Sequence, residues 1–294
     1  MKTALITGGN SGIGKETARA LARQGYQVLI AARDSHKCRE VVRSIKAEQP
    51  GAQIDWLPVD LSDFDSIGSF AHEVARRLPV IDALVLNAGL YTKQLTTNQA
   101  GIEMMFAVTH LGHFLLAHHL LPHVTAAPDG RIVVSSSVAH WVGGGIDVDA
   151  LRHPSPHQFL QLAPFQAYGR SKLANMLFVR ELARRLQGSS VKVNGFHPGG
   201  IKSDFWRDTP AWITALVGPF LVSEAVGAKT QIHLASHEGL NVSGEYWSGR
   251  KVRQGSPANR NQALARQLWE YSEQVLGIKA FGVSLPSESL ARAG

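Results

Sequence analysis

Cysteine is almost absent from this chain of 294 residues, in which Cys38 is the single example. One thiol excludes an intrachain disulfide and a metal site built from several thiolates, and it fits a reducing compartment. The N-terminal residues MKTALITGG lead straight into a predicted strand and a glycine turn, without the pattern of a signal peptide. These features together predict a cytoplasmic protein.

The sequence also lacks a long apolar run and a dense basic run. No stretch of about 18 apolar residues occurs, so we expect no transmembrane segment. The formal net charge is +7, but the lysines and arginines are scattered along the chain. Nucleic-acid binding depends on a clustered basic surface, and we therefore expect no nucleic-acid partner. An anionic cofactor or a weak attraction to a membrane surface fits this charge better.

A metal site is not indicated by the histidines, although several lie close together in the sequence. Their spacing matches no zinc template, and no Cys or Glu accompanies them. The histidines concerned are residues 110, 113, 118, 119 and 123. We predict that the chain holds no metal.

Short apolar runs alternate with amphipathic segments over most of the chain. Strands are expected at residues 3–7, 27–32, 53–60, 82–89, 131–137 and 191–200 and at GEYWSG. Helices are expected at residues 12–24, 35–48, 63–78, 101–121 (ended by Pro122), 165–187, 223–237 and 260–276. This order is typical of an α/β fold with a doubly wound, mostly parallel sheet of the Rossmann type, with about seven strands and helices on both faces. We expect a single domain over residues 1–276 and a loosely ordered tail over 277–294.

The segment TGGNSGIG, residues 7–14, joins the first predicted strand to the first predicted helix. Glycines there allow a tight turn and a close approach of a pyrophosphate to the N-terminus of the helix, which attracts anions. The spacing departs from the common G-x-G-x-x-G fingerprint, and a purely structural turn is the alternative. The strand–turn–helix context favours a dinucleotide site. The candidate cofactor residues in the turn are Gly8, Asn10, Ser11, Gly12, Ile13 and Gly14.

The second predicted strand ends in LIAARD, which bears on the choice of dinucleotide. An acidic residue at this place usually binds the ribose 2′-hydroxyl of NAD, but the position is taken by Ala32. Arg33 follows and offers a guanidinium to the 2′-phosphate of NADP. Asp34 could be the acid displaced along the chain, or it could cap the next helix. We favour NADP (NADPH) over NAD.

Tyr168 and Lys172 lie four residues apart in a predicted helix, on one face of it. A plain interpretation is that the tyrosine packs while the lysine extends to solvent. The alternative is a chemical pair, and the surrounding motifs decide between the two.

Taken in order, the motifs resemble the short-chain dehydrogenase/reductase superfamily over roughly residues 1–250. The matching segments are TGGNSGIG, VDLSD, NAG, IVVSSS, YGRSK and HPGGIKSD. LGHFLL, SSSVAH, YGRSKLANMLF and LWEYSE are most similar to the retinol-dehydrogenase-like branch. The resemblance implies an oxidoreductase that transfers a hydride between nicotinamide and a lipophilic carbonyl compound or alcohol.

The resemblance also implies catalytic roles. Tyr168 would be the general acid or base, and Lys172 would lower its pKa and bind the ribose. A lysine at ~5 Å in an effective dielectric of ~20 contributes ~3 kcal/mol, or ~2 pKa units. Ser137 would orient the substrate oxygen, with Ser135 and Ser136 as rivals for that role.

Further cofactor contacts follow from the same resemblance. Asp60 and Leu61 would lie at the adenine, the NAG segment would line the cleft, and the HPGGI segment would flank the nicotinamide. The residues implied in these two segments are Asn87, Ala88, Gly89, Pro198, Gly199 and Ile201.

One position departs from the family pattern. Thr109 stands where the family usually has an asparagine that supports a helix kink and a water chain from the lysine. A threonine keeps a hydroxyl but has a shorter reach and fewer donors. The role of Thr109 is therefore the doubtful part of the site, although His110 and His113 are close enough in sequence to compensate.

The segment at about 202–222 would be the substrate lid of the family. It is rich in apolar side chains, which predicts a lipophilic aldehyde, ketone or alcohol as the substrate, although a buried helix would show the same composition. These side chains are Phe205, Trp206, Trp212, Ile213, Leu216, Val217 and Phe220. A cofactor-binding regulator or scaffold of the same fold, with weak or no turnover, is the alternative function, and the chain could form a homo-oligomer.

Overall fold

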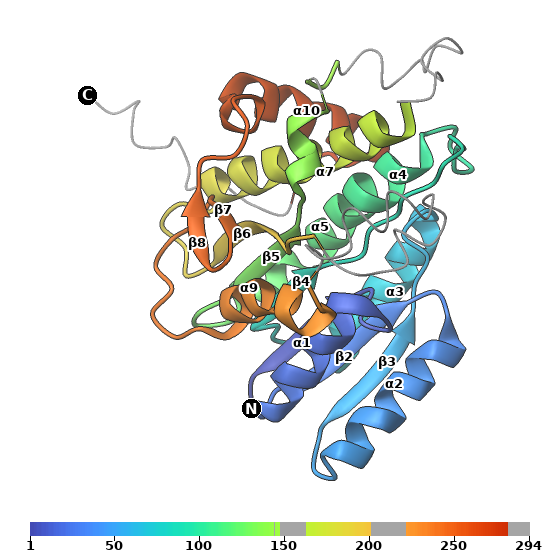
Figure 1. Cartoon of the computed structure of the whole chain (residues 1–294), viewed down its shortest axis with the longest axis vertical. Coiled ribbons are helices and arrows are strands. Elements are labelled where there is room, and N and C mark those ends of the chain that lie inside the picture. The colour runs from blue at the N-terminus through green and yellow to red at the C-terminus, as the bar shows by residue number, and fades with distance from the viewer. Residues whose placement is uncertain (144, 148–162, 201–221, 282–294) are drawn as a thin grey trace.

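The strands pair side by side into one eight-stranded sheet in the order β3-β2-β1-β4-β5-β6-β7-β8 (Figure 1). The computed structural model describes residues 1–143, 145–147, 163–200 and 222–281. The strands are β1 Thr3–Thr7, β2 Gln27–Ala32, β3 Ile54–Pro58, β4 Ala83–Leu86, β5 Arg131–Ser135, β6 Lys192–His197, β7 Tyr246–Ser248 and β8 Lys251–Arg253. All neighbours pair in parallel except β7 and β8, which are antiparallel. The predicted doubly wound sheet is confirmed.

The helices connect these strands and cover both faces of the sheet. The α-helices are α1 Gly12–Arg23, α2 Ser35–Glu48, α3 Phe64–Arg77, α4 Met104–Phe106, α5 Gly112–Thr125, α7 Ala163–Arg185, α9 Glu224–Ser236 and α10 Gln262–Leu276. A π-helical turn, η1 Ala107–Leu111, joins α4 to α5. Two short 3₁₀ helices, η2 Val138–Trp141 and η6 Ala258–Arg260, complete the described elements.

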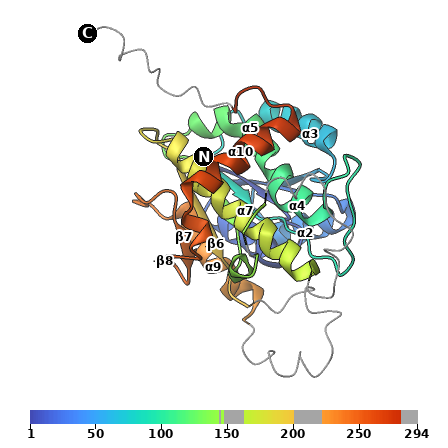
Figure 2. The ribbon, with the colours of Figure 1, turned by 90° about the horizontal axis from the view of Figure 1, so that it is seen from above.

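Alternating side chains of the strands build two hydrophobic cores. In β1, Ala4 and Ile6 pack with α1, α2 and α9, whereas Leu5 packs with α3, α5 and α7 on the opposite face. This alternation follows from the two-residue repeat of a strand that is buried on both sides. Helix α10 lies against α7 in an outer position, as both views show (Figures 1 and 2).

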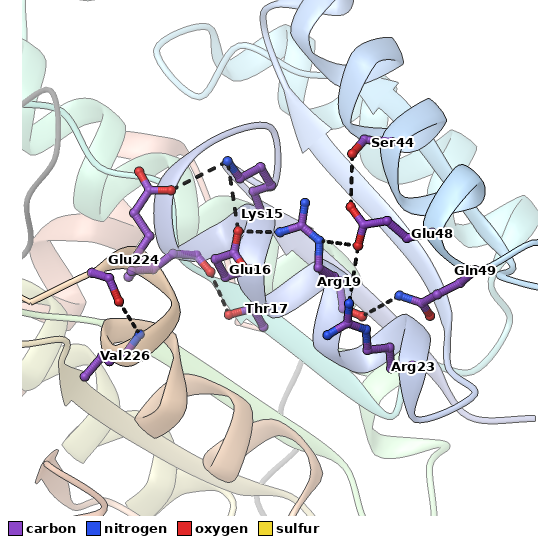
Figure 3. A network of polar contacts seen from close by, with 12 residues as sticks. Lys15, Glu16, Thr17, Arg19, Arg23, Ser44, Glu48, Gln49, Glu224 and Val226 are labelled. Carbon is purple, nitrogen blue, oxygen red and sulfur yellow. Dashed lines mark hydrogen bonds and ion pairs between the residues drawn. The ribbon is translucent and has the colours of Figure 1, made fainter.

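A polar network on one face joins α1 to both of its neighbours (Figure 3). The Glu48 carboxylate on α2 accepts hydrogen bonds from Arg19 Nε at 2.9 Å and Arg23 Nη2 at 3.3 Å. Lys15 Nζ lies 3.6 Å from a carboxylate oxygen of Glu224, at the start of α9. Partly exposed ion pairs contribute little each to stability, but together they orient the helix that begins at the glycine turn.

Two details of the secondary structure differ from the sequence predictions. Pro122 does not end α5, which continues to Thr125: the proline lacks an N–H donor, but its carbonyl still accepts from Ala126 N at 3.1 Å. Strand β8 brings the sheet to eight strands, one more than predicted. Its residues, Lys251–Arg253, are all exposed and carry no apolar pattern that would indicate a strand.

The central helical stretch combines length with apolar composition. Among the described residues, only Met104–Thr125 is long and apolar enough to cross a membrane, and most of that stretch is buried inside the protein. Its side chains supply the centre of the larger core, including Phe114 and Leu120. A core helix therefore accounts for the composition, and the expected lack of a transmembrane segment stays a prediction.

The chain after α10 is more closely packed than expected. Gly277 ends the helix with a φ of +66°, and Phe281, which is 2% exposed, turns back onto the core. Its ring centroid lies 4.8 Å from that of Phe114 and 4.6 Å from that of Trp269. The expectation of a loose tail from residue 277 is wrong for this part, and residues 282–294 lie outside the described residues.

Phe281→Ala is predicted to lower the free energy of unfolding by about 3 kcal/mol, because it removes a buried ring from an aromatic cluster. Val252→Ala on the exposed β8 strand serves as the control and should change it by less than about 0.5 kcal/mol. Chemical denaturation of both variants measures the difference. Equal stability of the two variants would show that Phe281 does not pack in solution as described.

Candidate active site

The candidate site lies where the carboxyl ends of β1 and β4 meet, the point at which the strand order reverses. In open α/β sheets this crevice is the usual place for a ligand. Asn87, just after β4, joins the two strands because its Nδ2 donates to the carbonyl of Thr7 at 2.9 Å. The predicted glycine turn and NAG segment are therefore brought together.

The glycines of the turn are needed for its shape. Gly8 and Gly12 have φ values of +65° and +55°, which other residues rarely adopt. At Gly14, an added Cβ would lie 2.3 Å from the carbonyl oxygen of Gly8. The turn therefore packs tightly against the start of α1, and glycine is needed at each of these three positions.

The N-terminus of α1 fits a phosphate group. Ser11 is the N-cap residue, but its side chain forms no capping hydrogen bond, and the first turn of α1 contains no acidic residue. Backbone N–H groups at a helix start attract an anion when no side chain satisfies them. Asn10 and Ile13 belong to the same turn, so the residues present fit the pyrophosphate of a dinucleotide.

The end of β2 places a cation and two carboxylates near the same edge of the sheet. Asp34 caps α2, since its carboxylate accepts a hydrogen bond from Lys37 N at 3.0 Å. Of the two roles expected for Asp34, the structure therefore shows the helix cap. The Arg33 side chain is 64% exposed, and its Nη1 lies 3.9 Å from Asp60 Oδ2. Arg33 is thus held only by a long, exposed ion pair, which is a weak restraint on its guanidinium. Leu61, also expected at the adenine, is buried.

The three serines after β5 have distinct contacts. Ser137 shares a hydrogen bond with the phenol of Tyr168. Ser136 Oγ donates to the backbone carbonyl of Lys172 at 2.9 Å, and the Ser135 carbonyl accepts from Lys172 Nζ at 3.3 Å. Ser137 is therefore bonded to Tyr168, whereas Ser135 and Ser136 bond to Lys172 of α7.

Lys172 is 3% exposed and sits beneath Tyr168, with Nζ 5.6 Å from the centre of the tyrosine ring. Among the described residues no carboxylate forms an ion pair with it, and burial lowers the pKa of Lys172 to about 8. Gly89 passes close by, since an added Cβ there would lie 3.1 Å from Nζ. The loop after β4 therefore passes close to the ammonium at Gly89, where a larger residue would push the lysine side chain aside.

The pKa of Tyr168 differs from the prediction. Its side chain keeps some exposed surface, but surrounding protein raises the pKa to about 12, and the hydrogen bond from Ser137 opposes this only in part. The expectation that Lys172 lowers the pKa of Tyr168 is not met by the protein's own groups. Removing a phenolate from water has a larger effect here than a lysine that is itself poorly solvated.

Thr109 lies in the π-helical turn between α4 and α5. The helix is therefore irregular at this point although the family's asparagine is missing. Thr109 is fully buried, and its Oγ1 accepts from the backbone N–H of Leu90 at 3.4 Å. In this chain the hydroxyl is used to hold the loop that follows Gly89.

Three supporting residues were not singled out from the sequence. His140 Nε2 accepts from Ser256 N at 2.9 Å, while its Nδ1 donates to the carbonyl of Ser137. His197 Nδ1 accepts from Val138 N at 3.4 Å, and Asn175 Nδ2 donates to the Ser135 carbonyl at 2.9 Å. Each lies inside a recognised motif, which was the available signal. They fix the segment that carries Ser137.

The remaining predicted cofactor residues fall into two groups. Ala88 follows Asn87, and Pro198 and Gly199 follow β6 at the same edge of the sheet, with a φ of +94° at Gly199. Ile201 and the lid segment, apart from Val222, lie outside the described residues.

The histidines near α5 have separate partners. His110 Nε2 lies 3.0 Å from Ser272 Oγ, and His123 Nδ1 lies 3.1 Å from the carbonyl of Pro79. Within the described parts of the chain, His, Cys, Asp and Glu side chains form no group of three that could hold a metal ion. The absence of a metal stays a prediction.

Comparisons with known proteins agree with this arrangement. The family model described as short chain dehydrogenase matches residues 2–146. Retinol dehydrogenase 13 of Homo sapiens is 38% identical, over 95% of this chain and 86% of that protein. Retinol dehydrogenase 12 of Mus musculus is 40% identical, over 95% of this chain and 87% of that protein.

Solved structures share the fold. An uncharacterized protein from Mycobacterium paratuberculosis is 32% identical, with a TM-score of 0.76 and coverage of 94% of both chains. The active-site complex of Pseudomonas aeruginosa RhlG with NADP is 26% identical, with a TM-score of 0.67, and covers 83% of this chain and 93% of that one. Similarity that extends over nearly the whole chain shows that the protein belongs to the short-chain dehydrogenase/reductase family of oxidoreductases, in its retinol-dehydrogenase-like branch.

Proposed function

We propose that the protein is an NADP(H)-dependent oxidoreductase that interconverts lipophilic aldehydes or ketones and the corresponding alcohols. The observation that carries the proposal is the grouping of three side chains: the Tyr168 phenol is hydrogen-bonded to Ser137, and the buried Lys172 Nζ lies 5.6 Å from the centre of the tyrosine ring. A packing role for the tyrosine does not require a second hydroxyl or a buried cation. The loop Asn87–Gly89 connects this group to the glycine turn, because Asn87 bonds to the Thr7 carbonyl and Gly89 lies close to Lys172 Nζ.

The roles of the side chains follow from their chemistry. A bound nicotinamide cofactor supplies the hydride in reduction and accepts it in oxidation. Ser137 donates a hydrogen bond to the substrate oxygen, and Tyr168 gives its proton to that oxygen as negative charge develops there. Lys172 holds the ribose hydroxyls through its ammonium. The spent proton of Tyr168 is replaced from solvent.

Apolar side chains near the catalytic tyrosine support the substrate class. Val138, Trp141 and Val142 follow Ser137 and are 54%, 57% and 45% exposed. Phe165 is 40% exposed and stacks near Tyr168 at a centroid distance of 6.5 Å. Exposed apolar groups gathered beside a site favour an apolar ligand. The retinol named in the relatives is a lipophilic alcohol, and this likeness supports the same class here.

Arg33 supports NADP as the partner in hydride transfer. Its guanidinium extends from the end of β2 without a buried ion pair, and Ala32 leaves space beside it. A 2′-phosphate would add a charge-assisted hydrogen bond at this place, whereas the 2′-hydroxyl of NAD would gain less from a cation. RhlG, which shares the fold, is described in complex with NADP.

A cofactor-binding regulator without useful turnover is the second candidate, and Thr109 at the asparagine position is the observation that favours it. A panel of apolar aldehydes, ketones and alcohols, followed by NADPH and NADH absorbance, separates the two. Turnover with NADPH supports the enzyme, and cofactor binding without turnover across the panel supports the regulator. Cytoplasmic location and homo-oligomer formation belong to the same proposal and are checked by cell fractionation and light scattering.

Tyr168→Phe is predicted to reduce turnover at least ~10²-fold with little loss of cofactor affinity, because it removes the proton donor and almost no volume. Between pH 6 and 9 the wild-type rate of carbonyl reduction should not fall through deprotonation of Tyr168, because its pKa of about 12 keeps the phenol protonated. Alcohol oxidation needs the phenolate and should accelerate as the pH rises.

Steady-state rates in both directions across this pH range measure the effect, with Tyr91→Phe as the matched control. The Tyr91 ring contacts that of Tyr168 edge to face at 5.8 Å, so Tyr91→Phe removes a neighbouring hydroxyl and keeps this ring contact. Wild-type turnover in Tyr168→Phe would remove Tyr168 as the proton carrier.

Arg33→Ala is predicted to weaken NADPH binding about 10- to 150-fold, which corresponds to a charge-assisted hydrogen bond of roughly 1.5–3 kcal/mol. NADH binding should change little, because it carries no 2′-phosphate. Fluorescence titration with both cofactors measures the two affinities, with Arg43→Ala on α2 as a control for the loss of a surface charge. Equal losses for both cofactors would contradict the assignment.

A further inference from the structure

His113 is fully enclosed at the start of α5, with 1% of its surface exposed, and both ring nitrogens have partners. Nδ1 lies 3.0 Å from the carbonyl oxygen of Thr109, one turn earlier. Nε2 lies 2.8 Å from Oγ1 of Thr7, the last residue of β1. One imidazole therefore joins the π-helical turn to the strand that leads into the glycine turn.

These contacts define the protonation of the ring. A carbonyl oxygen can only accept, so Nδ1 carries the hydrogen. The Thr7 hydroxyl already accepts from Asn87 N at 2.9 Å and from Ala88 N at 3.0 Å, which occupies its two lone pairs. Its own hydrogen therefore goes to Nε2 at 2.8 Å, which is a much shorter contact than the other available acceptor, the Val85 carbonyl at 3.4 Å. The imidazole is neutral, in agreement with a pKa that burial and, secondarily, the charge of Lys172 lower to about 3.

The Thr7 hydroxyl is in this way fixed in orientation by His113. With its hydrogen directed to Nε2, both of its lone pairs face the Asn87 and Ala88 N–H groups. Asn87 Nδ2 also bonds to the Thr7 carbonyl, and its distance from the Gly8 carbonyl is 3.4 Å. Gly89 next passes over Lys172. A change at His113 is thus transmitted to the phosphate turn and to the loop beside the lysine.

We propose that His113 is a positioning residue of the cofactor site, which acts through the Thr7 hydroxyl to fix the Asn87–Gly89 loop against the glycine turn. This inference rests on the proposed dinucleotide-dependent function. This role requires more of His113 than aromatic packing does, because one ring nitrogen must accept from the Thr7 hydroxyl while the other donates to the Thr109 carbonyl. The Thr7-facing nitrogen is the one that matters for the cofactor.

Two substitutions separate the nitrogens. The amide of His113→Gln reaches the place of Nε2 and can accept from Thr7, whereas that of His113→Asn reaches only the place of Nδ1. His113→Leu removes both contacts, and Thr7→Val removes the hydroxyl itself. Leu120→Ala on the same helix is the control, because Leu120 is fully buried in the larger core about two helical turns after His113. It lowers stability by cavity formation alone.

The experiment measures the NADPH dissociation constant and the thermal midpoint of each purified variant. His113→Leu and Thr7→Val should each weaken NADPH about tenfold, as expected for a buried group left without its partner. The double variant should be no weaker than either single one, because both remove the same link. His113→Gln should bind NADPH more tightly than His113→Asn, and Leu120→Ala should bind it as wild type does.

Several results would overturn the inference. Equal NADPH affinity in His113→Gln and His113→Asn, or additive losses in the double variant, would show that the Thr7 contact is not what His113 contributes. If His113→Leu does not fold, the comparison of the Gln and Asn variants still decides. A wild-type protein that binds neither NADPH nor NADH would instead contradict the proposed function, so the two failures are distinct.

Discussion

The site depends on one costly arrangement, the burial of the Lys172 ammonium without a carboxylate paired to it in the described structure. Its pKa falls from 10.5 to about 8, which corresponds to a loss of about 3 kcal/mol of folding stability at neutral pH. Because the folded state binds its proton more weakly, this penalty is present below pH 8 and disappears as the pH rises toward 10.5. The two cores on either side of the sheet supply the stability that offsets it. A ligand rich in oxygen atoms at this place would relieve the same penalty.

The groups around the lysine are accordingly neutral and fixed. Ser135 offers its carbonyl, Gly89 leaves room above the ammonium, and Tyr168 stays protonated because its surroundings disfavour a phenolate. The histidines nearby have lowered pKa values, first because they are buried and also because a second positive charge near Lys172 is unfavourable for His113 and His197. Neutral imidazoles can donate with one nitrogen and accept with the other, so they hold loops in place without adding charge. The frame of the site should therefore keep its shape across the physiological pH range.

Sequence reasoning located most strands and helices because apolar residues repeat with the period of each element. It missed β8, whose exposed residues Lys251–Arg253 are held by pairing with β7, and it misplaced the end of α5 because Pro122 can be tolerated there. The burial of Phe281 was not predicted, because it depends on Phe114 and Trp269, which are far from it or separated from it by a turn in the sequence. Within the site, the structure places Ser137 and Lys172 next to Tyr168, and the catalytic roles that the motifs imply for them stay predictions. The pKa of Tyr168 and the link from Thr109 through His113 to Thr7 required the three-dimensional distances, since these depend on burial and on residues far apart in the chain.

The central claim is that the cofactor binds with its ribose beside the Lys172 ammonium. Calorimetric titration with NADPH at pH 8.5, in two buffers of different ionisation enthalpy, tests it most directly. At that pH the lysine of the unliganded protein is partly deprotonated, since its pKa is about 8. Hydrogen bonds from the ammonium to ribose hydroxyls should raise this pKa, so binding should take up a substantial fraction of a proton, and Lys172→Met should abolish the uptake. Binding without proton uptake, or equal uptake by Lys172→Met, would contradict the account.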